Sequence, residues 1–187
     1  GTITPENFYR KQIEDLKSHL NSLLKQKQLL GWIRFGILVA TGLLIWLFAE
    51  YGIFLAAAIF ATGLAVFLFA VRKDLANKEA IHHHERLIKI NEQEQLYLQH
   101  TYTHQKDGIE FYKDEHPYAG DLDIFGHASL YQYINRTNSQ QGNQRLADWL
   151  SAPSNATTIV ARQKAVLELT QQTHWRQELQ AHGSSAI

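Results

Sequence analysis

The sequence predicts an all-α protein with a two-helix transmembrane hairpin, long flanking stalk helices and a small helical unit at the C-terminal end. Two charge-free apolar runs, residues 35–49 and 53–71, stand on either side of a short polar corner. Residues 6–30 and 72–105 flank these runs and contain neither Gly nor Pro, which favours uninterrupted helices. Beyond residue 120, short segments show a helical spacing of apolar residues.

These patterns divide the chain into five predicted segments. They are an N-terminal amphipathic helix (1–31), a transmembrane helical hairpin (32–71), a stalk helix (72–106), a linker (107–120) and a helical unit (121–187). The linker is predicted from turn-forming pairs such as His116-Pro117 and Ala119-Gly120.

The composition excludes several kinds of site. Cysteine is absent, so disulfides, thiolate zinc sites and thiol nucleophiles are excluded. The formal net charge is zero, so no global basic field attracts nucleic acid. Methionine is absent even at position 1, and the chain closes on a polar stretch. We therefore expect a processed, engineered or partial sequence.

The two apolar runs are predicted to cross a membrane. A spanning helix needs about 20 mostly apolar residues, and residues 53–71 meet this requirement alone. The first run meets it if Arg34 lies at the boundary and extends its guanidinium to the headgroups. Both runs are apolar all round, whereas a surface helix keeps a polar face. The alternative is a buried hairpin in a soluble domain, but the remaining chain is too polar and too small to cover it.

The charges beside the runs predict the orientation. Only Glu50 lies in the corner between them. By the positive-inside rule, both termini are cytoplasmic and the corner is outside. The predicted location is the inner (cytoplasmic) membrane, with two passes and the lipid bilayer as partner. The basic residues on which this orientation rests are Lys25, Lys27 and Arg34 before the first run, and Arg72, Lys73 and Lys78 after the second.

Small residues recur every four positions within the runs. Gly36 is followed by Ala40, and Ala57 by Ala61 and Ala65. Small side chains let membrane helices approach closely, so we predict that the hairpin packs on itself through these faces. The same faces suit a homodimer, which the sequence leaves open.

The two flanking segments are predicted to pair as an antiparallel stalk, because the hairpin returns the chain to the side it left. An amphipathic N-terminal arm lying on the membrane is the alternative. Each segment carries an apolar stripe at spacings of three and four. The first stripe consists of Ile13, Leu16, Leu20, Leu23 and Leu30, broken by Lys27, and the second of Ala80, His83, Leu87, Ile90 and Tyr97, broken by Glu94.

Three groups of residues resemble metal or acid–base sites, but we assign no catalytic, cofactor or metal residue. The run from His82 to Glu85 has zinc-ligand chemistry, yet adjacent helical residues point in different directions and favour a solvated face. His100 and His104 have helical spacing but no evident third ligand. Asp121 and Asp123 are better explained as the lead-in to a helix than as an acid pair.

The C-terminal unit is predicted to hold four short helices. Ser139 can cap the second, Asn155 or Thr157 can cap the third, and Ala152-Pro153 separates these two helices. Trp175 and Leu179 indicate a fourth. The core candidates are Leu130, Ile134, Leu146, Trp149, Leu150, Ile159 and Val166.

An ordered series of motifs in this last third resembles the start of the core domain of the MutS family. The matching pieces are Asp121-Leu122-Asp123-Ile124-Phe125-Gly126, Ser129-Leu130, Asn135-Arg136-Thr137, Gly142, Leu146-Ala147-Asp148-Trp149-Leu150, Pro153, Ile159, Arg162-Gln163 and Ala165-Val166. In that family, the core or lever helices connect a C-terminal ATPase to a DNA clamp. The matched residues look structural, and Arg136 and Arg162 favour ion pairs over contacts with phosphate or a neighbouring domain.

The departures from the family pattern affect the expected function. The Phe-x-Glu mismatch wedge has no counterpart, because Phe111-Tyr112-Lys113 is a different motif. No phosphate-binding loop Gly-x4-Gly-Lys-Ser/Thr occurs in these residues. The resemblance therefore implies a bacterial, membrane-anchored MutS-like ATPase whose ATP- and Mg-binding domain lies outside this chain. It allows DNA binding only through the full-length protein. The alternative is a non-catalytic membrane adaptor with a helical protein-interaction module.

Overall fold

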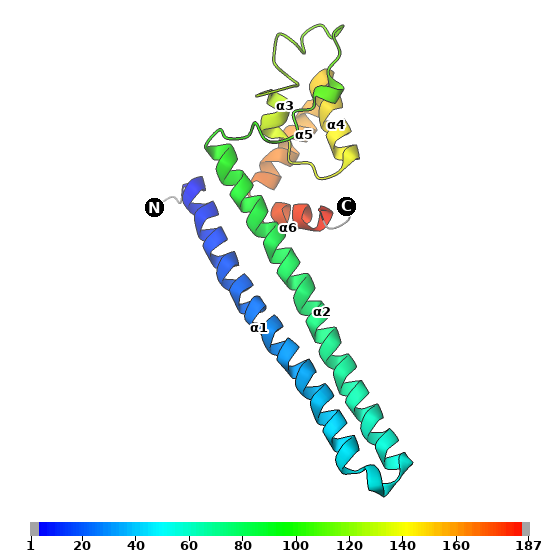
Figure 1. Ribbon diagram of the computed structural model, residues 1–187. Helices are drawn as coiled ribbons and strands as arrows, with labels where there is room; N and C mark the ends of the chain where they lie inside the picture. Colours follow the sequence, from blue (N-terminus) through cyan, green and yellow to red (C-terminus); the bar gives the residue numbers. More distant parts are fainter. Residues whose placement is uncertain (1–3, 185–187) are drawn as a thin grey trace. The chain divides into compact units, whose positions relative to one another are not determined.

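The computed structural model describes residues 4–184, and all regular elements in that range are helical (Figure 1). The chain divides into two compact units: one holds residues 14–85, and the other holds residues 1–13 with residues 86–187. Both long helices contribute to both units. The elements are α1 (Pro5–Leu47), a 3₁₀ turn (Ala49–Tyr51), α2 (Ile53–Leu98), a second 3₁₀ turn (Ile109–Phe111), α3 (Leu130–Ile134), α4 (Gln140–Ser151), α5 (Ala156–Thr170) and α6 (Thr173–Gly183).

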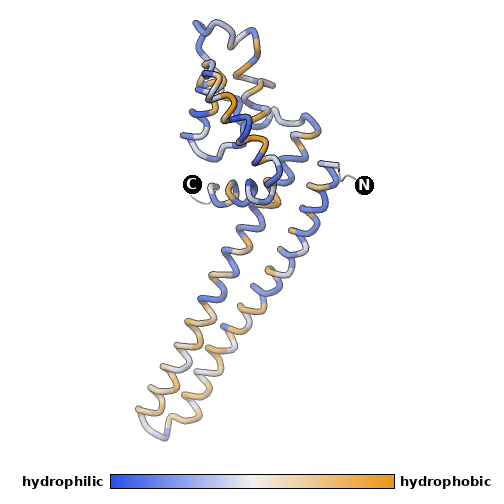
Figure 2. The backbone as a smooth tube through the Cα atoms, turned by 180° about the vertical axis from the view of Figure 1, so that it is seen from behind, coloured by the Kyte–Doolittle hydropathy of each residue, from blue (hydrophilic) through white to orange (hydrophobic). Residues whose placement is uncertain are grey.

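Within residues 14–85, α1 and α2 run antiparallel and side by side (Figures 1 and 2). The Asn77 side chain donates a hydrogen bond to the Leu23 carbonyl at 3.0 Å. Nearer the corner, Thr41 of α1 lies against Gly63 of α2. In these two contacts the residue number rises along α1 while it falls along α2, as antiparallel pairing requires.

The shielded residues of α1 follow the predicted stripe. Ile13 is buried, Leu16, Leu20, Leu23 and Leu30 are half-buried, and the Lys27 that interrupts them is exposed. A spacing of three and four places these side chains on one face of a helix, which explains the pattern.

The α2 helix presents different faces in the two units. Within residues 14–85, its shielded positions next to α1 include Asn77, Ile81 and His84, whose ring lies 6.2 Å from that of His19. This face differs from the predicted stripe. From that stripe, Leu87, Ile90 and Tyr97 are buried in the other unit. A single stripe was predicted because periodicity does not distinguish one neighbour from another.

The end of α2 comes earlier than the sequence pattern indicated. The helix ends at Leu98 rather than near Gln105. His100 adopts a left-handed conformation (φ 56°), and the Thr101 amide donates to the Leu96 carbonyl at 2.8 Å. This is the Schellman geometry that closes helices, usually with glycine at the left-handed position. A histidine there left no recognisable stop signal in the sequence.

Three of the short helices begin at a side-chain cap, and two of these caps, Ser139 and Asn155, were predicted. Ser129, Ser139 and Asn155 accept amide hydrogen bonds from residues three positions later at 3.2, 3.0 and 2.8 Å. Of the two candidates for α5, Asn155 is therefore the cap. Side-chain capping satisfies an amide that has no partner inside the helix, which is why local sequence located these ends.

The buried core of the C-terminal part is built largely on connecting segments. Its members are Ala119, Ile124, Phe125, Tyr131 and Ala147. Gly108 allows this packing, because it has φ 68° and a Cβ there would lie 2.6 Å from the Tyr131 ring. Side-chain-bearing residues would be both strained and obstructed at this position.

Most of the predicted core residues are not in this core. Leu146 and Leu150 pack against it, but the other five candidates are exposed. The α5 helix has no buried residue among those described. Its apolar positions have helical spacing, yet the described chain places little against them. The residues wrongly predicted to be buried are Leu130, Ile134, Trp149, Ile159 and Val166.

Replacing Gly63 with isoleucine tests the close approach of α1 and α2. The larger side chain would meet Thr41, whose Cγ2 would lie only 2.6 Å from a Cβ at position 63. Overpacking of this kind typically costs about 1–3 kcal/mol. We expect Gly63→Ile to lower the thermal unfolding midpoint, measured by circular dichroism in detergent micelles.

Gly42→Ile is the matched control, since nothing lies within 4 Å of a Cβ at position 42. Equal midpoints for the two variants would contradict the packing described here.

Candidate functional site

The apolar segment of the hairpin leaves large side chains uncovered by the rest of the chain. Trp46 is 74% exposed and Phe54 is 90% exposed. In the most apolar stretch of α1 no residue is buried, and in that of α2 only 6% are. Figure 2 shows the continuous hydrophobic colouring of both helices toward the corner. Both helices are long and apolar enough to cross a membrane. The burial expected of core helices in a soluble domain is missing from the described part of this chain.

The few polar side chains inside the apolar segment are internally satisfied. The Thr41 hydroxyl donates to the Ile37 carbonyl at 2.7 Å, and the Thr62 hydroxyl donates to the Ala58 carbonyl at 2.9 Å. A hydroxyl bonded to its own helix needs no water, so both threonines are compatible with a hydrocarbon environment.

A polar cluster lies beyond the apolar segment on both helices. An Arg34 guanidinium nitrogen lies 2.9 Å from an Asp74 carboxylate oxygen, joining α1 to α2. One turn along α2, Asn77 is buried and bonded to the α1 backbone. Asp74 Oδ1 and Asn77 Oδ1 are buried without a hydrogen-bond partner among the described residues. Partly satisfied polar groups in a helix seam cost stability but restrict the pairing to one register.

The small residues expected to pack the hairpin are all exposed, so the prediction that the hairpin packs on itself through them was wrong. They are Gly36, Ala40, Ala57, Ala61 and Ala65. The close approach involves Gly63 instead. Small residues occur on several faces of each helix, and the sequence alone did not indicate which face contacts the other helix.

In the other unit, an ion pair joins α2 to the segment after α3. Arg136 donates to the two Glu94 carboxylate oxygens at 2.6 and 3.3 Å. Its guanidinium carbon also lies 3.2 Å from the centre of the Tyr97 ring. Two-point contact and stacking over an aromatic ring are characteristic of arginine and are not reproduced by lysine. The sequence-based preference for an Arg136 ion pair is confirmed.

Further hydrogen bonds reinforce this junction. The Tyr97 hydroxyl donates to the Asn135 carbonyl at 3.1 Å, and the Gln177 amide of α6 donates to Asn91 of α2 at 2.9 Å. Burial raises the pKa of the Tyr97 phenol, although the nearby Arg136 partly opposes this shift. Neutral Tyr97 therefore remains a hydrogen-bond donor. We call the residues Asn91, Glu94, Tyr97, Asn135, Arg136 and Gln177 the α2 clamp.

A buried polar network lies next to the α2 clamp. The Asn143 side-chain carbonyl accepts hydrogen bonds from the Asn135 amide, the Tyr131 hydroxyl and the Thr137 hydroxyl. Burial, with a smaller contribution from the Glu110 carboxylate, raises the pKa of Tyr131 to about 12. These polar groups bond to one another, which identifies them as structural.

The remaining candidate residues do not form an acid–base array. Arg162 stacks 4.1 Å from the Trp149 ring and donates to Ser154. The side chains of Asp121 and Asp123 are exposed in the turn before α3. His82 contacts Glu85, whereas His84 contacts the Ala80 carbonyl of its own helix.

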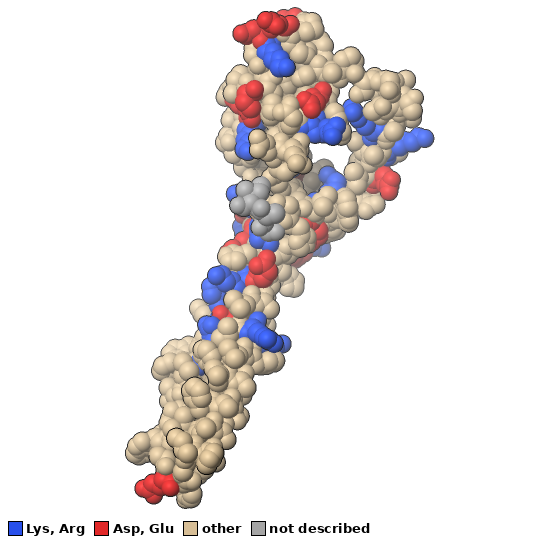
Figure 3. All heavy atoms as spheres, turned by 90° about the vertical axis from the view of Figure 1, so that its right-hand side faces the viewer, with Lys and Arg blue, Asp and Glu red and all other residues tan. Residues whose placement is uncertain are grey.

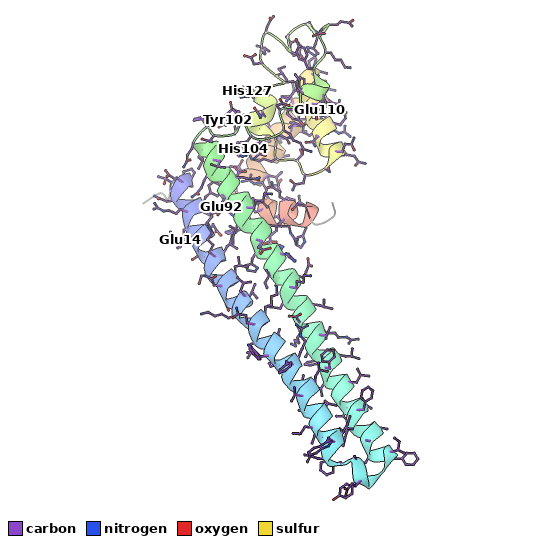
Figure 4. The ribbon with its side chains drawn as sticks, viewed as in Figure 1. Glu14, Glu92, Tyr102, His104, Glu110 and His127 are labelled. Atoms are coloured by element: carbon purple, nitrogen blue, oxygen red, sulfur yellow. The ribbon has the colours of Figure 1, made fainter. Side chains whose placement is uncertain are left out.

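The pair His100 and His104 lies beyond α2, so the helical spacing assumed for it does not exist. His104 belongs to the connecting segment, as do Tyr102 and Glu110 (Figure 4). Its ring nitrogen contacts the Gln105 side chain at 2.9 Å. The unrecognised Schellman ending of α2 accounts for this error.

Comparison with known proteins gives one match. Residues 119–186 match the family model of MutS domain III. The matched residues include α3, α4 and α5, and the match supports a relation to the MutS family. Neither the curated proteins nor the solved structures gave a match.

The α2 clamp joins this matched region to a helix whose other end is apolar. Arg136 and Gln177 lie inside the match, and Glu94 and Asn91 lie on α2. The sequence pointed to Arg136 but not to its partners on α2. In the sequence, Glu94 only interrupts an apolar stripe. Its ion pair with Arg136, which is 42 residues away, has no signature in the neighbouring sequence.

A double-mutant cycle on Glu94 and Arg136 tests the α2 clamp. We expect Glu94→Gln and Arg136→Gln each to destabilise the protein, with a coupling energy of about 1–2 kcal/mol, because the pair is half-buried and bidentate. Chemical denaturation of both single variants and the double variant gives the coupling.

Arg145→Gln is the control for loss of one positive charge, because Arg145 is exposed. Additive effects of the two substitutions at positions 94 and 136 would show that the contact is energetically unimportant.

Proposed function

We propose that this chain is the membrane-anchoring and core-domain portion of a MutS-like, mismatch-repair-type ATPase. The hairpin holds the protein in the inner membrane with both termini in the cytoplasm. The longer protein adds an ATPase domain that binds ATP and Mg and acts on DNA or on a partner. The observation that carries the proposal is the joint presence of two uncovered apolar helices and a MutS domain III match in one chain.

Charge and solvation support the membrane part of the proposal. The apolar segment of α2 from Ile53 to Val71 extends about 28 Å at 1.5 Å per residue, close to the roughly 30 Å of a hydrocarbon core. At the corner, Glu50 is exposed and Gly52 has φ 102°, which closes the turn in few residues. Basic residues border the apolar segment only at the end away from the corner (Figure 3).

The α2 clamp supports the coupling part of the proposal. A single helix, α2, begins beside the corner and ends in the unit that contains the MutS domain III match. Its last three turns are held by an ion pair and by hydrogen bonds to matched residues. A movement of the matched region would therefore act directly on a helix that enters the membrane.

The alternative function is a non-catalytic membrane adaptor whose helical unit binds protein. It shares the hairpin and the α2 clamp, and it differs in lacking an ATPase domain encoded further along the gene. Both functions assign DNA contact at most to the full-length protein, because the basic residues of the matched region are few and scattered.

Cysteine labelling tests the membrane topology. The chain lacks cysteine, so single cysteines report on one position without a background. We expect Glu50→Cys to react with a membrane-impermeant maleimide from the periplasmic side of intact cells. Lys106→Cys, at an exposed residue beyond α2, should react only after the membrane is opened.

Equal reactivity of the two positions in intact cells would contradict the topology. Recovery of the unlabelled chain in the soluble fraction without detergent would contradict the membrane anchor itself.

The downstream coding sequence separates the ATPase from the adaptor. We expect a phosphate-binding loop Gly-x4-Gly-Lys-Ser/Thr followed by an acidic residue at a strand end, because such a loop holds nucleotide phosphates and Mg. Sequencing of the complete gene is sufficient. A stop codon soon after codon 187 would favour the adaptor.

A further inference from the structure

Five basic side chains surround the hairpin at the end of its apolar segment. All five are exposed, and none forms a salt bridge with a carboxylate in the described part of the chain. Arg34 is excluded from the set because Asp74 neutralises it. Figure 3 shows the charged side chains that begin where the apolar surface ends. The five residues, which we call the basic collar, are Lys25, Lys27, Arg72, Lys73 and Lys78.

The pairing register places the basic collar in one layer. Because Asn77 bonds to the Leu23 carbonyl, Lys25 and Lys27 lie level with the part of α2 just before Asn77. Arg72 and Lys78 are six residues apart, which is about 9 Å along the helix. The headgroup region of one leaflet is roughly 5–8 Å thick. The five charges are therefore confined to a band comparable to a headgroup layer.

Neighbouring side chains add hydrogen-bond donors to this band. A shallow groove along α1 is lined by Ser18, Asn21, Ser22, Lys25, Gln26 and Leu29. Hydroxyl and amide groups there stand next to an ammonium, and the 60% exposed Leu29 continues toward the apolar segment. On α2, the Lys73 ammonium lies 5.8 Å from the centre of the Phe69 ring. Along the hairpin toward the corner, basic groups and hydrogen-bond donors are followed by apolar surface. A phospholipid presents its charged headgroup and then its acyl chains in the same order.

From this arrangement we propose that the basic collar binds acidic phospholipid headgroups and gives the hairpin a preference for them over zwitterionic lipids. The inference rests on the proposed membrane anchor and adds the class of lipid. Clusters of four to eight basic residues directly beside a membrane helix attract anionic lipids. The exposed carboxylate at the opposite end, Glu50, makes this attraction one-sided.

The test uses the full 187-residue chain reconstituted in phosphatidylcholine bilayers that contain either spin-labelled phosphatidylglycerol or spin-labelled phosphatidylcholine. The motionally restricted fraction gives the relative association of each lipid. We expect phosphatidylglycerol to associate at least about fivefold more strongly, the effect of one basic residue at the surface. We expect the ratio to fall as salt screens the charges.

A variant without the basic collar assigns the preference to these residues. In it, Lys25, Lys27, Arg72, Lys73 and Lys78 are all replaced by glutamine, and the expected ratio of the two association constants is about one.

A matched variant removes the same number of exposed basic residues elsewhere and should keep the wild-type ratio. Its substitutions are Lys11→Gln, Lys106→Gln, Lys113→Gln, Arg145→Gln and Lys164→Gln.

The outcomes separate the inference from the proposed function. If an alkaline carbonate wash strips the wild-type chain from the bilayer, the membrane anchor fails. If the chain is retained and its ratio is near one, only the lipid preference is overturned. An equal loss of preference in both glutamine variants would also overturn the inference, since net charge alone would then explain it.

Discussion

The structure depends on apolar helix surface that its own chain does not cover. Two helices that present large side chains on all sides are destabilised in water in proportion to the exposed apolar area. Trp46 and Phe54 are exposed, so the described chain provides no core for this surface, and the proposed membrane anchor would supply an apolar phase in its place. The same constraint explains why the threonines bond to their own backbone and why Glu50, in the corner, is the one charged residue between Arg34 and Arg72.

The polar residues of α2 determine how this helix is held at its far end. Apolar contacts are non-directional, so a stripe of Leu and Ile alone would permit several rotations of the helix. The bidentate pair between Glu94 and Arg136 and the bond between Asn91 and Gln177 fix one rotation and one register. These polar contacts therefore specify the orientation of α2. The ring of Tyr97, which lies against the Arg136 guanidinium, shields that group from solvent.

Sequence patterns were reliable where the determining interaction is local. The predicted caps at Ser139 and Asn155 each bind an amide three residues away, so a short window contains the whole interaction. The stripe of α1 was correct because its period is a property of one helix.

Predictions failed where the determining partner is distant or unusual. The core was misplaced because Ile124 and Phe125 are buried from a connecting segment, where no periodicity exists to reveal them. His100 ended α2 in a conformation usually adopted by glycine. The partners of Arg136, which are Glu94 and Tyr97, lie far earlier in the chain, so only the folded structure identifies them.

The distribution of polar contacts also bears on where chemistry takes place. The side-chain carbonyl of Asn143 has three donors, and both ring nitrogens of His116 are engaged by backbone groups near Ser151 and Tyr118. Groups bonded in this way are held in place, whereas a reacting group must be able to exchange its partner for a substrate. These contacts thus hold the side chains of the described C-terminal part in a fixed geometry. Under the proposed function, a reaction cycle of the longer protein would therefore reach α2 by displacing the matched region rather than by rearranging these side chains.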